Sequence, residues 1–157
     1  MAKGDERPTT GSLLWRVSMK WRAAVDRAVE PLGLTHAQNS LLASLYGRTL
    51  AGEAPSQRQL ADHSGLDPIY VSKLIRALER SGLVTRTTDP HDSRAVRLAL
   101  TPDGERVVRR AVRIVHDLLD ELTAPIGGLA GEPNRQLNDL LQQLLGDQPG
   151  STKGTAP

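Results

Sequence analysis

The sequence predicts a mainly α-helical protein with one small two-stranded β element. Apolar residues recur at helical spacing through most of the 157 residues, and helix-start signals stand at Thr35, Ser56, Asp67 and Thr101. Alternation at strand spacing is confined to residues 83–100. A chain of this length suits one domain, or one domain with an added oligomerisation element.

The composition excludes several kinds of chemistry. Because the chain has no cysteine, it cannot form a disulfide, a thiolate zinc site or a cysteine redox sensor. No stretch resembles a signal peptide or an apolar run of membrane-spanning length. We therefore expect a soluble, cytoplasmic protein with no membrane partner, and a core of aliphatic side chains because phenylalanine is absent.

The first third of the chain predicts an arm and two helices. Residues 1–10 are polar and lack an apolar period, so we expect a mobile arm. An amphipathic helix should run from roughly Ser12 to Glu30 and end at Pro31. Thr35 and Gln38 form a capping box that starts the next helix. The apolar positions of the two helices are Leu14, Val17, Trp21, Val25, Ala28, Leu41, Leu42, Leu45 and Tyr46.

Residues 56–80 predict two short helices joined by a turn. Ser56 and Gln59 form a capping box, and Gly65 can adopt the positive φ that ends a helix. Asp67 and Pro68 then supply an N-cap and a first-turn proline for a second helix. The core face of that helix is the stripe Val71, Leu74, Ile75 and Leu78.

The opposite face of the second helix carries side chains that contact phosphates and base edges in DNA. A solvated helix face is the alternative for such residues. They are Tyr70, Ser72, Lys73, Arg76, Ala77 and Arg80.

A hairpin follows this helix. Residues 83–87 have the β-branched content of a strand, Asp89 to Asp92 is turn chemistry, and residues 95–100 alternate as a half-buried return strand. Arg94 lies near the tip, and a cation on a projecting wing suits the electronegative minor groove. Together the elements predict a winged helix-turn-helix.

The charge distribution favours a nucleic-acid partner. Residues 56–100 hold seven basic and five acidic side chains, whereas the remainder of the chain holds thirteen of each. The formal excess of +2 therefore lies in the segment predicted to bind DNA. An excess of this size suggests DNA binding without deciding it.

The segment LERSGLVTRTTDPHDSRAVRLALTPDGERV resembles the wing signature of the MarR (multiple antibiotic resistance regulator) family. Residues 33–38 also resemble the entry into that family's second helix. The resemblance implies a homodimeric, ligand-tunable winged-helix repressor, in which Asp92 orients wing arginines and Arg94 enters the minor groove. The residues that match the signature are Leu78, Glu79, Gly82, Leu83, Asp92, Arg94, Leu100, Thr101 and Gly104.

Two C-terminal helices are predicted to serve dimerisation. A helix of about 22 residues starts after Thr101, and a second starts near Pro133 with leucines at i, i+3, i+4, i+7 and i+8. One small winged-helix core cannot cover that much apolar surface, and a two-fold dimer would also read two half-sites. An intramolecular helical bundle remains the alternative.

These elements predict a division of the chain. Residues 1–10 form the arm, residues 11–34 and 101–146 the helical dimerisation region, and residues 35–100 the winged helix-turn-helix. Residues 147–157 are rich in Gly, Pro, Ser and Thr and are expected to be a disordered tail.

The resemblance also implies an effector site. Family members bind small, often aromatic and anionic effectors between the dimerisation helices and the winged-helix module. Ordinary packing in a core or dimer interface is the alternative for each candidate. By position, the candidates are Trp15, Arg16, Met19, His36 and Tyr46.

No other chemistry emerges from the motifs. The histidines lack i, i+4 spacing, and only His116 lies on the long helix where some MarR relatives bind zinc, so no metal site or cofactor is expected. No catalytic constellation is present, so we expect no enzyme.

The sequence therefore predicts a homodimeric repressor that binds double-stranded DNA. The alternative is a winged-helix protein–protein interaction module. The expected DNA-binding residues are Ser56, Gln57, Arg58, Pro68, Tyr70, Ser72, Lys73, Arg76, Arg86, Asp92, Arg94 and Arg97.

Overall fold

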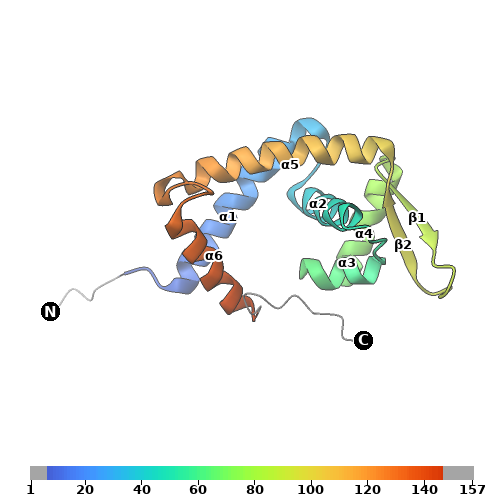
Figure 1. Cartoon of the computed structure of the whole chain (residues 1–157), viewed down its shortest axis with the longest axis horizontal. Helices are drawn as coiled ribbons and strands as arrows, with labels where there is room; N and C mark the ends of the chain where they lie inside the picture. The colour runs from blue at the N-terminus through green and yellow to red at the C-terminus, as the bar shows by residue number, and fades with distance from the viewer. Residues whose placement is uncertain (1–6, 147–157) are drawn as a thin grey trace. The chain divides into compact units, whose positions relative to one another are not determined.

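A computed structural model describes residues 7–146 (Figure 1). The predicted tail, residues 147–157, and the first six residues of the predicted arm lie outside the described residues. The predicted fold class is confirmed: the structure is mainly helical with one antiparallel pair of strands. The elements are α1 (Thr10–Val29), a 3-10 turn (Glu30–Leu32), α2 (His36–Leu50), α3 (Gln57–Ser64), α4 (Pro68–Arg80), β1 (Val84–Thr88), β2 (Val96–Leu100), α5 (Pro102–Thr123), a 3-10 turn (Ala124–Ile126) and α6 (Glu132–Leu145).

The chain divides into two compact units between Val115 and His116. None of the described helices is both long and apolar enough to cross a bilayer.

In the first unit, α1 begins slightly before the predicted start because the Thr9 hydroxyl accepts a hydrogen bond from the Ser12 backbone N–H. Only the C-terminal part of α1 contributes to the core, through Val25 and Val29. The predicted capping box of Thr35 and Gln38 starts α2, which packs against α1, α3, α4 and β2. This contact set makes α2 the central helix of the unit.

Helices α3 and α4 and the hairpin surround one aliphatic core. The stripe Val71, Leu74, Ile75 and Leu78 is buried as predicted, and Leu60 and Ala61 of α3 join it. Burial of a Val, Leu or Ile side chain of this kind stabilises the fold by about 1.5–3 kcal/mol. The remaining buried apolar residues of the unit are Leu34, Leu41, Leu42, Leu45, Leu83, Val84, Leu98, Val108 and Ala111.

Strands β1 and β2 pair antiparallel, with Val84 opposite Leu100 and Thr88 opposite Val96. The hairpin is fastened to the chain before α3, because the Leu98 backbone N–H donates to the Pro55 carbonyl. At its base, α5 packs tightly against the residue that precedes β1: a Cβ on Gly104 would collide with the Leu83 carbonyl oxygen. The base of the hairpin is therefore held in place on both sides.

The second unit holds the end of α5, the turn at Ala124–Ile126, and α6. The Asp120 carboxylate accepts from the Leu129 backbone N–H, and the Asn134 amide donates to the Leu129 carbonyl, so the connection to α6 is held by side chains. The leucine stripe of α6 is present as predicted. Its side chains are exposed at Leu137, Leu140, Leu144 and Leu145.

Candidate nucleic-acid interface

Helix α4 presents a cationic face opposite its buried stripe. Asp67 accepts from the backbone N–H groups of Ile69 and Tyr70, which confirms the predicted N-cap and sets the start of the helix at Pro68. Lys73, Arg76 and Arg80 are exposed, and Ser72 is half-buried beside them. A helix with an apolar inner face and a cationic outer face can lie along a phosphate-lined groove.

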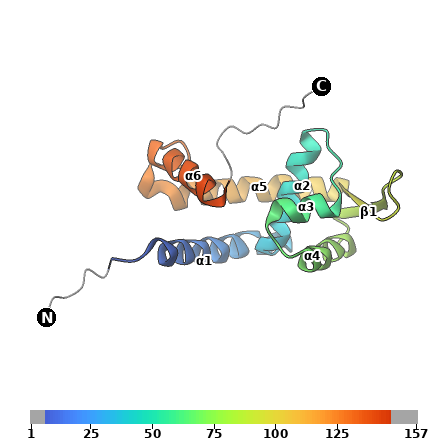
Figure 2. The same cartoon turned by 90° about the horizontal axis from the view of Figure 1, so that it is seen from below.

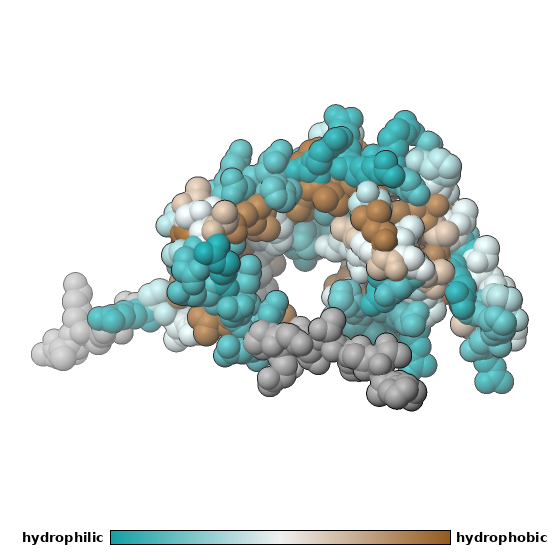
Figure 3. Space-filling view, in the orientation of Figure 1, coloured by the Kyte–Doolittle hydropathy of each residue, from teal (hydrophilic) through white to brown (hydrophobic). Residues whose placement is uncertain are grey.

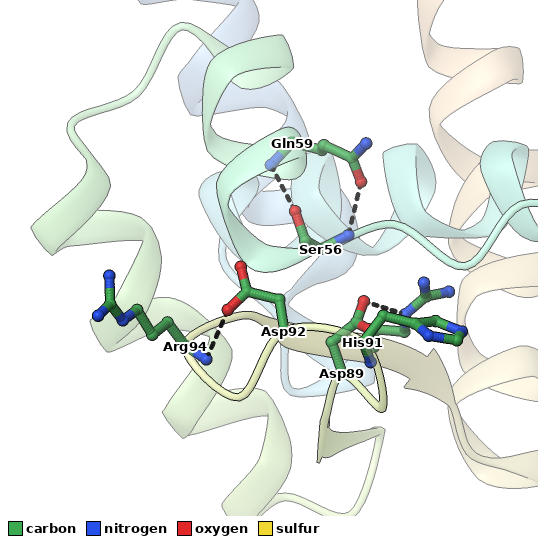
Figure 4. Close-up of polar contacts among 7 residues, drawn as sticks. Ser56, Gln59, Asp89, His91, Asp92 and Arg94 are labelled. Atoms are coloured by element: carbon green, nitrogen blue, oxygen red, sulfur yellow. Dashed lines mark hydrogen bonds and ion pairs between the residues drawn. The ribbon is translucent and has the colours of Figure 1, made fainter.

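The start of α3 lies next to the wing. The Ser56 hydroxyl accepts from the Gln59 N–H at 3.1 Å, and the Gln59 amide accepts from the Ser56 N–H at 2.8 Å, so both predicted halves of the capping box form (Figure 4). A groove of about 860 Å³ runs between this helix start and the wing. Six predicted DNA-binding residues line it together: Ser56, Gln57, Arg58, Pro68, Asp92 and Arg94.

The wing extends beyond α3 and α4, and its projecting end is hydrophilic (Figures 2 and 3). Its loop is closed by backbone hydrogen bonds from Asp89 to Ala95 and from Ala95 to Asp92. Asp92 Oδ1 also accepts from the Arg94 backbone N–H at 2.9 Å, while the Arg94 side chain points away from that carboxylate (Figure 4). The loop therefore holds the Arg94 backbone and leaves its guanidinium outward.

The three wing arginines differ in their partners. Arg97 Nε donates to Asp89 Oδ2 at 2.5 Å, and Arg86 Nη1 donates to Glu79 Oε2 at 3.4 Å. Within residues 7–146, no carboxylate lies within ion-pairing distance of Arg94. Arg94 is thus the wing cation available to a ligand, whereas Arg86 ties β1 to α4.

Two carboxylates, Asp92 and Asp89, contact the wing arginines in different ways. The Asp92 carboxylate accepts from the Arg94 backbone N–H, and the guanidinium of Arg97 donates to Asp89, which the sequence pattern identifies only as a turn residue. A backbone hydrogen bond from His91, followed by the Arg97 hydrogen bond, lowers the pKa of the Asp89 carboxyl below its ordinary 3.8. Asp89 therefore stays ionised and keeps its contacts at neutral pH.

The five effector candidates are not gathered at one place. Trp15 is 66% exposed and Arg16 is exposed beside it, so the pair encloses no subsite. Met19 lines a shallow depression on α1, and Tyr46 is half-buried outside the cavities described here. His36 alone lines a cavity formed by α1, α2, α3 and α4.

That cavity holds about 450 Å³ and carries polar groups that the sequence did not single out. Arg22, His63 and Ser64 lie on its wall with His36, and the hydroxyl of Ser44, also on the wall, is buried without a hydrogen-bond partner among the described residues. The tertiary fold alone brings these helices together, so no local pattern could identify the set. The remaining lining residues are Ala37, Ser40, Leu66 and Tyr70.

Burial and nearby charges act in different directions on the pKa of the His36 imidazole. Burial lowers the pKa of its imidazole below the ordinary value of 6.5, the Asp26 carboxylate partly offsets this, and Arg22 adds to it. The His36 backbone N–H donates to Asp26 Oδ1 at 2.6 Å, which fixes the start of α2 against α1. The imidazole is therefore predominantly neutral at neutral pH.

Comparison with known proteins agrees with this architecture. The sequence model of the MarR family matches residues 34–96. An uncharacterised HTH-type transcriptional regulator of Bacillus subtilis, YdcH, is 36% identical over 108 residues, covering 69% of this chain and 74% of that protein.

Solved structures extend the similarity over most of the chain. A MarR-family transcriptional regulator from Rhodococcus sp. RHA1 is 31% identical with a TM-score of 0.76, covering 92% of this chain and 96% of that one. Staphylococcus aureus MepR, in a complex with DNA, is 25% identical with a TM-score of 0.76, covering 88% and 95%. The resemblance seen in the wing signature is confirmed, and the chain belongs to the MarR family of transcriptional regulators.

Proposed function

We propose that this protein is a homodimeric repressor that binds a pseudo-palindromic operator and is released from it by a small effector. The observation that carries the proposal is the shared groove: the capped start of α3, the start of α4 and Arg94 of the wing line one surface. In this arrangement α4 lies in the major groove, Arg94 enters the flanking minor groove, and the start of α3 faces the phosphate backbone. MepR, of the same fold, has been solved with DNA.

The homodimer is supported by apolar side chains that the described chain leaves uncovered at both ends. Leu13, Leu14 and Val17 of α1 are exposed, as are Leu140 and Leu144 of α6. Exposed apolar surface of this kind is typical of a protein interface. We assign dimerisation to residues 11–34 and 101–146 and DNA binding to residues 35–100.

The effector is supported by the cavity that contains His36. The Arg22 guanidinium can pair with an anion, the neutral His36 imidazole can donate a hydrogen bond to it, and the unpartnered hydroxyl of Ser44 can meet a further polar group. Tyr70 of α4 lines the same cavity, so a small aromatic or anionic ligand there would contact the DNA-reading helix directly. The protein would act by binding, without catalysis, in the cytoplasm where its operator lies.

The test is selection of bound sites from a random duplex library, with purified protein at about 50 and 200 mM salt. A dimeric reader should recover a pseudo-palindrome and lose affinity steeply as salt rises. A folded, dimeric protein that selected no motif would overturn the proposal and favour an interaction module.

A further inference from the structure

An exposed aliphatic side chain, Ile69, occupies the outer face of α4. Ile69, Lys73 and Arg76 stand at positions i, i+4 and i+7 and so share one face of the helix. Val71 and Leu74 lie on the opposite face. The Ile69 side chain is 68% exposed, whereas the core stripe is buried. The outer face of α4 therefore carries an isoleucine at its N-terminal end, followed by the cations Lys73 and Arg76.

Ile69 differs from its two neighbours along the chain, each of which lines a hollow in the protein surface. Pro68 lines the groove beside the wing, and Tyr70 lines the cavity with His36. Ile69 lines neither the groove nor the cavity. A lone exposed isoleucine is common on protein surfaces, but this one stands in the first turn of the helix assigned to the major groove.

We propose that Ile69 contacts the C5-methyl group of a thymine in each half-site and thereby contributes to sequence specificity. The inference rests on the proposed function, because it requires α4 to lie in the major groove. The first residues of a recognition helix meet base edges, and the thymine methyl is the apolar group that the major groove displays. Lys73 and Arg76 on the same row neutralise phosphates and hold the isoleucine against the bases.

The experiment removes the methyl group without changing the protein. In the selected operator, each thymine is replaced in turn by deoxyuridine, at the symmetric positions of both half-sites, and affinity is measured by titration. Deoxyuridine retains the hydrogen-bonding edge of thymine, so only the methyl contact is lost. At one position the wild-type protein should lose about fourfold per half-site, which is about fifteenfold for the pair.

The same scan with Ile69→Ala links the methyl group to this residue. The variant should bind the thymine operator more weakly than wild type and should not distinguish thymine from deoxyuridine at that position. Leu50→Ala is the matched control, because Leu50 is 69% exposed and lies at the end of α2 outside the groove. Its deoxyuridine profile should equal that of wild type.

Several outcomes would overturn the proposal while the repressor function stands. The selected half-sites could lack an invariant thymine, or the wild-type protein could bind every deoxyuridine operator as tightly as the thymine operator. Ile69→Ala could also lose as much affinity as wild type at the deoxyuridine-sensitive position. Failure to select any operator would instead remove the proposed function and this inference together.

Discussion

Asp89, the residue after β1, pairs diagonally across the hairpin with Arg97 of β2, whose Nε donates to Asp89 Oδ2 at 2.5 Å. The Asp89 side chain is only 12% exposed, and its other oxygen accepts from the His91 backbone N–H. One carboxylate thus joins the second strand to the first residues of the wing loop. The loop that presents Arg94 is anchored by this contact.

Replacing Asp89 should loosen the wing without unfolding the protein. Asp89→Asn weakens both hydrogen bonds, so operator affinity should fall several-fold because Arg94 is less well placed. Gel-shift titration measures the change. Asp103→Asn is the matched control, since Asp103 pairs with Arg106 in the first turn of α5, away from the groove. Equal affinity in the two variants would contradict the anchoring role.

Arg94→Ala should weaken operator binding by about 1–3 kcal/mol per half-site and reduce the salt slope by about two, one for each protomer of the proposed dimer. The reason is that Arg94 is the wing arginine without a carboxylate partner among the described residues. Titrations at several salt concentrations measure both quantities. Arg110→Ala removes the same charge from an exposed position on α5 and should leave affinity nearly unchanged. Unaltered binding by the Arg94 variant would sink the minor-groove assignment.

His36 should make stability depend on pH. Its pKa is lowered in the folded protein, so the unfolded chain takes up a proton near the ordinary 6.5 while the folded chain resists it. The free energy of unfolding should therefore fall as the pH drops below 6.5 and level off beneath the folded pKa. Urea unfolding across this range measures the effect. His36→Gln should flatten the dependence and the exposed His116→Gln should not; identical slopes would refute the assignment.

Gly104→Ala should destabilise the protein by about 1–3 kcal/mol, because a Cβ there meets the Leu83 carbonyl and the backbone must move. Gly47→Ala is the matched control: that position is helical with open space, and alanine should stabilise it by about 1 kcal/mol. Urea unfolding compares the two. A neutral Gly104→Ala would show that the junction of β1 and α5 is not tightly packed.

Leu140→Glu combined with Leu144→Glu should dissociate the proposed dimer, since each change places a charge in an apolar interface. Sedimentation analysis gives the mass in solution. Leu50→Glu alters a similarly exposed leucine on α2 and should leave the dimer intact. A variant dimer as tight as wild type would place the interface elsewhere.

The sequence by itself determined the local elements. The capping boxes at Thr35 and Ser56 and the cap at Asp67 formed as predicted, because each depends on atoms within three residues of one another. The apolar stripe of α4 and the length of α5 also followed from periodicity, since burial of one helix face imposes that period. The wing signature identified the family for the same reason: its spacing reflects a local turn and strand.

Only the tertiary structure decided which polar groups meet. Arg97 could have faced solvent or DNA until the register of the hairpin set it beside Asp89. Arg22, His36 and Ser44 share a cavity because four helices converge there, and no spacing within one helix encodes that convergence. The effector candidates chosen by position therefore did not gather at one site. Six of the twelve predicted DNA-binding residues do line one groove, because short connections hold α3, α4 and the wing together.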